Sequence, residues 1–214
     1  MRTFIYCSGS HGRVVLDILL RLNKKYINFI DDVPVKNVID YNVYSFDYIV
    51  SQDIENVEII IANGSPVIRK KIFLKLKKYG FNFINAIDKS AVVIPSAYLG
   101  VDNTIGINAI VNSGSLVGSH CIINNGAVLE HDCSIEDFAT ICPGCQIGGK
   151  SIISHGAFIC TGAIILPRVK IGRYSVVAAG SVVTKDIPDN TFVMGSPAKK
   201  VSAVDRNFNW NKLL

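Results

Sequence analysis

Residues 127–144, AVLEHDCSIEDFATICPG, decide the fold because they repeat one pattern of six residues. Each block opens on a small residue and has an aliphatic third residue, here Leu129, Ile135 and Ile141. The same division runs without insertion through sixteen blocks between Ala91 and Asp186, and every third residue is Val, Leu or Ile. A period of six does not fit the 3.6-residue turn of an α-helix. It predicts a left-handed parallel β-helix built from hexapeptides.

In such a β-helix three hexapeptides form one triangular coil, so residues 18 apart in this repeat stack on one face. The aliphatic third residue points inward, where each buried side chain contributes about 2 kcal/mol. The first residue must be small, which explains Cys121, Cys133 and Cys145 as small hydrophobic residues. Cys142 and Cys145 form a CPGC sequence, but no second pair or suitable histidine spacing accompanies it. We therefore expect no metal site.

His131 interrupts this apolar scaffold between Glu130 and Asp132. Gly149, 18 residues later, is expected to stack against it, leaving space and a backbone N–H beside the imidazole. A neighbouring carboxylate orients a histidine ring and raises its basicity, and Asp132 is the expected partner, with Glu130 in reserve. One interpretation is a general base beside an oxyanion donor. The other is an inert histidine in a surface turn.

A second column of stacked positions contains Pro143, Thr161 and Ala179. These small side chains are expected to leave a shallow groove that could hold an extended ligand. His120 and His155 also fall at turn positions, and we interpret both as inert.

The first part of the chain has a different pattern. Apolar runs at 3–7, 26–30, 57–63 and 81–87 predict strands, and residues 13–22 and 67–80 predict helices, which together indicate a small parallel sheet. The expected domains are a Rossmann-like domain over 1–88, for which a nucleotide sugar is the expected ligand, and a left-handed β-helix domain with a C-terminal tail over 89–214.

Two features of the first domain suggest ligand binding. The loop SGSHG, with Gly9 and Gly12, follows the first strand, and glycine-rich loops there bind phosphates at a helix N-terminus. Asp31 and Asp32 end the second predicted strand, where acidic residues bind ribose or base groups, although a simple turn is the alternative.

Composition excludes several classes of protein. The net charge is only +5 and no dense Lys/Arg block occurs, so we expect no nucleic-acid partner, whereas a small anionic substrate would be favoured. The N-terminus becomes glycine-rich too early for a signal peptide.

The most apolar stretch, GAFICTGAIILP, has 12 residues, short of the ~20 that a membrane helix needs. We expect no membrane association and a cytoplasmic location with six reduced cysteines.

Taken together, SGSHG, Asp31–Asp32, the hexapeptides, EHDC at 130–133 and GSPAKKV at 195–201 resemble bacterial sugar acyltransferases of the bacillosamine and sialic-acid type. The closest resemblance is to the UDP-4-amino-sugar N-acetyltransferases of bacillosamine synthesis, and it covers nearly the whole chain. It implies acetyl-CoA-dependent acetylation of the amine of a UDP-4-amino-4,6-dideoxy sugar. It also implies a homotrimer with active sites between neighbouring β-helices.

The resemblance implies roles for individual residues. His131 is the general base, and Asp132 raises its basicity. The nucleotide sugar is bound by Gly9, Ser10, His11, Asp31, Asp32 and Gly64. Acetyl-CoA is bound by Thr140, Thr161 and Ala179, and the N–H of Gly149 is the candidate donor to its thioester oxyanion. Thr140 stands where relatives often carry a second histidine, and Asp132 stands where the closest relatives carry Glu.

Other functions stay open at this point. The enzyme could acetylate a hydroxyl group, or the amine of another sugar, such as sialic acid or a dTDP- or GDP-linked amino sugar. The chain could instead be a non-catalytic β-helix that binds a nucleotide sugar, although His131 with its neighbouring acid argues against that. A γ-carbonic-anhydrase-like metalloenzyme has the same β-helix, but the four histidines lack a convincing ligand set.

Overall fold

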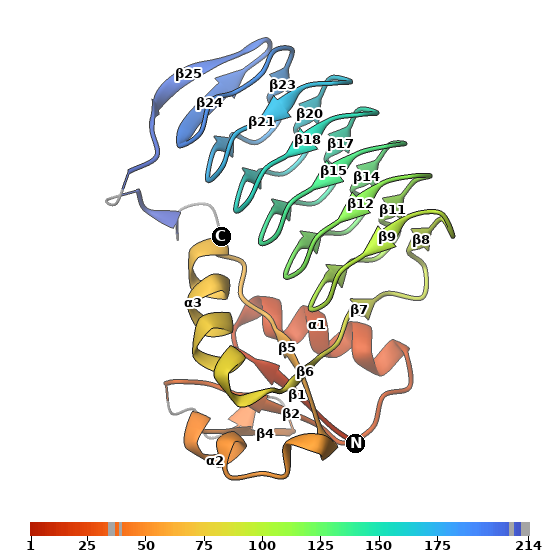
Figure 1. Cartoon of the computed structure of the whole chain (residues 1–214), viewed down its shortest axis with the longest axis vertical. Coiled ribbons are helices and arrows are strands. Elements are labelled where there is room, and N and C mark those ends of the chain that lie inside the picture. The colour runs from red at the N-terminus through yellow and green to blue at the C-terminus, as the bar shows by residue number, and fades with distance from the viewer. Residues whose placement is uncertain (34–36, 39, 206–207, 211–214) are drawn as a thin grey trace.

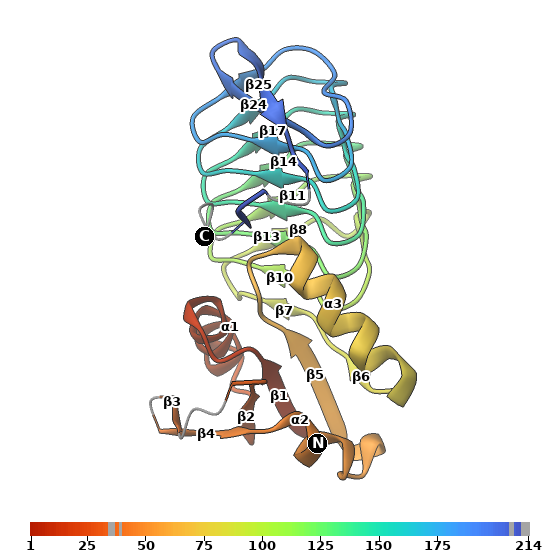
Figure 2. The same ribbon diagram turned by 90° about the vertical axis from the view of Figure 1, so that its left-hand side faces the viewer.

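The computed structural model describes residues 1–33, 37–38, 40–205 and 208–210. A small α/β domain lies at one end of a long β-helix, and the molecule is elongated (Figure 1). The view turned by 90° shows the coils stacked along the long axis, with α3 lying along the first coils (Figure 2).

The N-terminal domain has one sheet, whose strand order is β3-β4-β2-β1-β5-β6, parallel except for β3 against β4. Its strands are β1 (Arg2–Tyr6), β2 (Ile27–Ile30), β3 (Asn37–Val38), β4 (Tyr41–Tyr44), β5 (Val57–Ile61) and β6 (Asn82–Phe83). Its helices are α1 (Ser10–Arg21), α2 (Phe46–Val50) and α3 (Pro66–Leu76), with 3₁₀ turns η1 (Ile54–Asn56) and η2 (Lys77–Tyr79). The predicted βαβ pattern is confirmed, while β3, β4 and α2 have no counterpart among the predicted elements.

Local chemistry fixes the turn between β1 and α1. Cys7 has a φ of +83°, a conformation in which glycine is common. Gly12 must lack a side chain, because a Cβ there would lie 2.1 Å from the carbonyl oxygen of Cys7. These two residues bring the start of α1 close to the end of β1.

The β-helix has three parallel sheets, which we call sheets 1, 2 and 3. Sheet 1 contains β7 (Ala86–Ile87), β10 (Thr104–Ile105), β13 (Ile122–Ile123), β16 (Thr140–Ile141), β19 (Phe158–Ile159), β22 (Val176–Val177), β24 (Thr191–Gly195) and the antiparallel β25 (Ala198–Ala203). Sheet 2 contains β8 (Val92–Val93), β11 (Ile110–Val111), β14 (Val128–Leu129), β17 (Gln146–Ile147), β20 (Ile164–Ile165) and β23 (Val182–Val183). Sheet 3 contains β9 (Tyr98–Leu99), β12 (Leu116–Val117), β15 (Ser134–Ile135), β18 (Ile152–Ile153) and β21 (Lys170–Ile171).

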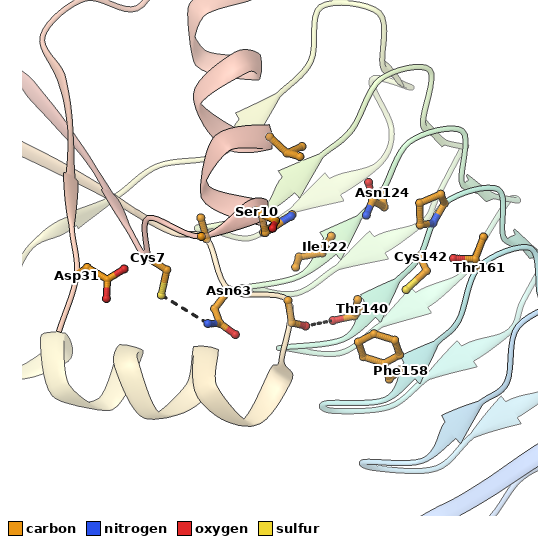
Figure 3. Close-up of a pocket in the computed structure, with 16 residues that line it drawn as sticks. Cys7, Ser10, Asp31, Asn63, Ile122, Asn124, Thr140, Cys142, Phe158 and Thr161 are labelled. Carbon is orange, nitrogen blue, oxygen red and sulfur yellow. Dashed lines mark hydrogen bonds between the residues drawn. The ribbon is translucent and has the colours of Figure 1, made fainter. Parts of the chain in front are cut away.

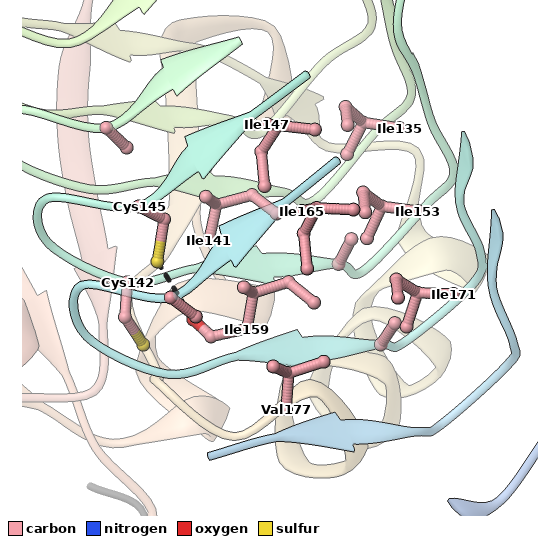
Figure 4. Close-up of a cluster of buried hydrophobic side chains, with 14 of the residues drawn as sticks. Ile135, Ile141, Cys142, Cys145, Ile147, Ile153, Ile159, Ile165, Ile171 and Val177 are labelled. Carbon is pink, nitrogen blue, oxygen red and sulfur yellow. Dashed lines mark hydrogen bonds between the residues drawn. The ribbon is translucent and has the colours of Figure 1, made fainter. Parts of the chain in front are cut away.

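The predicted register of the repeat is confirmed. Thr104 pairs with Ile122, and Ile122 pairs with Thr140, which are steps of 18 residues. The aliphatic third residues, such as Ile141, Ile147 and Ile153, form the buried core (Figure 4). Cys121, Cys133 and Cys145 are buried beside them, as expected for small first residues. Cys142 and Cys160, which stand at the fourth position of their blocks, are also buried.

The change from one domain to the other occurs within three residues. Ile84 N–H still donates to Ile59 in the N-terminal sheet, whereas Ala86 N–H donates to Asn103 in the first coil. Sheet 1 therefore begins with β7, just before the expected boundary between residues 88 and 89. At the other end, Trp210 packs on Phe158, so the tail returns to the outer face of sheet 1.

Candidate functional site

A cavity of about 660 Å³ lies where the N-terminal domain meets sheet 1 (Figure 3). From the first domain it is lined by Cys7, Gly9, Ser10, His11, Val14, Asp31, Ala62, Asn63 and Gly64. From the β-helix it is lined by Ile122, Asn124, Thr140, Cys142, Pro143, Phe158 and Thr161. Residues that the family resemblance links to two different ligands thus meet in one cavity.

His11 lies in the first turn of α1 and keeps one ring nitrogen unsatisfied. Its Nε2 atom is buried and has no hydrogen-bond partner within the described part of the chain. Burial, with a smaller contribution from the Arg69 cation, lowers the pKa of His11 to about 4. The ring is therefore neutral at pH 7 and can offer a ligand a donor or an acceptor.

The two acidic residues after β2 point to different places. The Asp31 carboxylate faces the cavity and accepts hydrogen bonds from the backbone N–H and hydroxyl of Ser8, at 2.8 and 2.6 Å. The Asp32 carboxylate instead accepts from Tyr6 Oη at 2.7 Å and Lys75 Nζ at 2.6 Å. Hydrogen bonds from Lys75 and Tyr6 outweigh desolvation and lower the pKa of Asp32. The cavity lining includes Asp31 but not Asp32.

The residues assigned to acetyl-CoA occupy different depths. Thr140 is buried, and its hydroxyl lies 3.5 Å from the Gly64 carbonyl of the other domain. Thr161 is exposed at the rim and stacks on Pro143, since Gly162 N–H donates to the Pro143 carbonyl. Ala179 is exposed one coil further on, outside the cavity lining. The predicted column of small residues is confirmed, and its first two members line the cavity.

His131 lies on another corner of the prism, in the turn between β14 and β15. Its Nδ1 is 2.9 Å from Asp132 Oδ2, and both side chains are more than half exposed, at 55% and 53%. The hydrogen bond to His131 lowers the pKa of Asp132, which keeps that carboxylate ionised at neutral pH. Glu130, the reserve partner, lies 3.4 Å from Asn112 Nδ2 instead.

Gly149 stacks against the His131 ring as the repeat predicts. A Cβ at Gly149 would lie 2.6 Å from His131 Nε2, so only glycine leaves the ring in place. The backbone is also paired here, because Lys150 N–H donates to the His131 carbonyl at 2.9 Å. Asp132 fixes Nδ1, and among the described residues no hydrogen bond reaches Nε2, which leaves that nitrogen open to a ligand.

Sheet 2 separates the histidine from the cavity. The cavity lies at the corner between sheets 1 and 2, and His131 lies at the corner between sheets 2 and 3. The outward side chains of sheet 2 are mostly aliphatic: Val92, Ile110, Val128, Gln146, Ile164 and Val182. Val92 and Ile164 are 48% and 40% exposed. One mostly apolar face of the prism therefore lies between the cavity and His131.

Comparison with known proteins places the chain in a family. Residues 2–76 match the family described as the PglD N-terminal domain, and residues 150–185 match the bacterial transferase hexapeptide family. A perosamine N-acetyltransferase from Caulobacter crescentus, solved as a histidine-to-asparagine mutant with CoA and GDP-perosamine, superposes with a TM-score of 0.90. It is 30% identical, over 94% of this chain and 97% of that one. The chain belongs to the family of acetyl-CoA-dependent sugar N-acetyltransferases.

Two further members of this family are similar. The acetyltransferase domain of PglB from Neisseria gonorrhoeae, in complex with acetyl coenzyme A, has a TM-score of 0.89 and 30% identity, over 94% of this chain and 98% of that one. A dTDP-3-amino-3,6-dideoxy-α-D-galactopyranose 3-N-acetyltransferase from Aneurinibacillus thermoaerophilus is 45% identical over 51 residues, 24% of this chain and 27% of its own. The first curated relatives match over a third of their length or less.

Several residues that line the cavity carry no distinct signal in the sequence. Asn63, Ile122, Asn124 and Phe158 line the cavity, but each lies within an ordinary strand or turn pattern. Among the described residues no cluster of His, Cys, Asp and Glu has the geometry of a metal site. In the same residues, no helix combines the length and apolarity needed to cross a bilayer.

Proposed function

We propose that this protein transfers the acetyl group of acetyl-CoA to the amine of a nucleotide-linked amino sugar, with His131 as general base. The observation that carries the proposal is the shared cavity, in which Gly9, Ser10, His11, Asp31 and Gly64 face Thr140 and Thr161. The start of α1 offers backbone N–H groups to a diphosphate. The rim at Thr161 and Ala179 would accept the coenzyme.

The chemistry needs one base and one oxyanion donor. His131 Nε2 would accept the proton of the amine as its nitrogen bonds to the thioester carbonyl carbon. Asp132 would hold the resulting imidazolium through Nδ1. The N–H of Gly149 would stabilise the tetrahedral oxyanion. As the C–S bond breaks, His131 would return the proton to the thiolate, so no acyl-enzyme forms.

We further propose that the enzyme is a homotrimer and that each site is shared by two subunits. A small ligand in the cavity is separated from His131 of the same chain by one side of the prism, which spans six residues or up to about 20 Å of extended backbone. A second copy packed on sheet 2 would cover its exposed aliphatic side chains and bring its own corner to the cavity. Because the two surfaces in this contact would differ, the contact would be head-to-tail, and three such contacts can close into a ring of three subunits.

For the sugar, a UDP-4-amino-4,6-dideoxy sugar is the first candidate, because the sequence resembles that group of enzymes. A GDP-linked amino sugar is the second, because the Caulobacter enzyme was solved with GDP-perosamine. The six free thiols fit a reducing cytoplasm, where we place the reaction.

The proposal is tested by measuring CoA release with a panel of UDP-, GDP- and dTDP-linked amino sugars. One of these should release CoA stoichiometrically with N-acetyl product, and the matching deaminated sugar should not. Release of CoA without an N-acetyl product, or no release with any amino sugar, would contradict N-acetyl transfer.

Gly149→Ala should lower turnover roughly 10- to 100-fold, because the added methyl group displaces the catalytic ring. The fold should survive, since no positive φ is needed at this position. Steady-state CoA release measures the effect, and Ser113→Ala, on the other side of the His131 turn, is the matched control. Equal turnover of Gly149→Ala and Ser113→Ala would show that the packing of the ring on Gly149 is irrelevant.

A further inference from the structure

Arg69 is a fully buried cation at the junction of the two domains. It lies in α3 and is 0% exposed, among the largest fully buried side chains of the described residues. Burial lowers the pKa of Arg69 to about 10, so it still carries its charge at neutral pH. A buried charge costs several kcal/mol unless it is well compensated, so its partners matter.

The guanidinium group joins both domains. Towards the first domain, Nη1 donates to the carbonyls of Asn63 and Gly64, each at 2.8 Å. Towards the β-helix, Nε donates to the His120 carbonyl at 3.0 Å, and Nη2 donates to the Phe138 carbonyl at 2.7 Å. Nη2 also donates to the Thr140 hydroxyl at 2.8 Å. A planar fork makes these contacts at once, which a lysine ammonium cannot do.

A buried His–Asp pair completes this junction. The Asp102 carboxylate lies 2.7 Å from His120 Nδ1 and accepts from the Ile61 N–H at 2.8 Å. The His120 ring stacks on Phe138 with centroids 4.6 Å apart and also contacts Phe73 of α3. His120, expected to be inert, thus helps to dock the end of β5 on the coils.

The groups that Arg69 holds are cavity walls. Asn63 and Gly64 line the cavity from one side, and Thr140 lines it from the other. We propose that Arg69 is a positioning residue, which sets the nucleotide-sugar wall of the cavity at a fixed distance from the coenzyme wall on the β-helix. The assignment of the two walls rests on the proposed function.

Arg69→Lys tests this role, with Arg21→Lys as the matched control. Arg21 also joins the domains, through Asp88 at 2.6 Å, but lies at the far end of α1, about 16 Å along the helix axis from Ser10. We expect Arg69→Lys to lower kcat/KM for the amino sugar roughly 10- to 100-fold, with the KM for acetyl-CoA unchanged. Arg21→Lys should lower only the Tm.

Two further measurements separate positioning from simple stability. Hydrogen exchange of residues 58–66 should be faster in Arg69→Lys than in the wild type or Arg21→Lys. Arg69→Ala should regain kcat/KM when millimolar guanidinium is added, because the ion can replace the missing group. Arg69→Ala with added guanidinium also serves as the second test if Arg69→Lys does not fold.

The outcomes are distinct. The positioning role would be overturned if Arg69→Lys and Arg21→Lys showed the same changes in kinetics and hydrogen exchange. It would also be overturned if both variants lost only Tm. Failure of the wild type to release CoA with any amino sugar would instead refute the proposed function, while the exchange comparison would still test Arg69.

Discussion

His131→Ala is expected to lose at least about 100-fold in turnover, the usual contribution of general base catalysis. Asp132 orients the ring at 2.9 Å, and Nε2 lies beside Gly149 with no hydrogen-bond partner in the described part of the chain, an arrangement that suits the proposed general base. Steady-state CoA release under saturating substrates measures the change. The KM values should alter little, because the ring is not part of the cavity lining.

The matched control for this variant is His155→Ala. His155 is another turn histidine, but its Nε2 lies 3.1 Å from both Lys70 Nζ and Tyr174 Oη, on the corner between sheets 3 and 1. This variant should keep its turnover even if the Tm falls. A His131→Ala enzyme as active as His155→Ala would remove the base from the mechanism.

The β-helix could be predicted in detail because its repeat controls register directly. Once the third residue is assigned to the core, every residue is paired with the one 18 positions away, and Thr104, Ile122 and Thr140 follow that rule. The stacking of Gly149 on His131 is a consequence of the same rule. Local sequence was sufficient here because each coil contacts only its neighbours.

The cavity could not be predicted, because it depends on how one domain docks on the other. Arg69 stands in the run IRKKIF, within the helix that the sequence predicts over residues 67–80. Its spacing from Ile72 and Leu76 places it on the apolar face, and that was the available signal. Asp31 and Asp32 are adjacent in sequence, but only Asp31 faces the cavity, since successive residues leaving a strand point to opposite sides.

Thr161→Trp is expected to lower turnover by about 100-fold as well, for a different reason. Thr161 stands exposed at the rim of the cavity. In the proposed trimer, an indole there would occupy the path between the cavity and the neighbouring subunit. If the sugar amine and the acetyl thioester are displaced from each other by about 1 Å or more, the rate gained from their correct orientation is lost. The side chain of Thr161 points away from the buried aliphatic core of the β-helix, so the variant should still fold. CoA release measures the loss, and Thr161→Ser is the control.

Combining this variant with His131→Ala tests whether sites are shared. If each site takes His131 from one subunit and the cavity from the next, co-assembly of the two inactive chains in equal amounts should restore about a quarter of the sites. Co-assembly of wild-type chains with the double variant should also leave about a quarter. If each site were contained within one chain, the first mixture would be inactive and the second would keep about half. Equal activity of the two mixtures is therefore the signature of a shared site, and it requires His131 and Thr161 to act across a subunit interface.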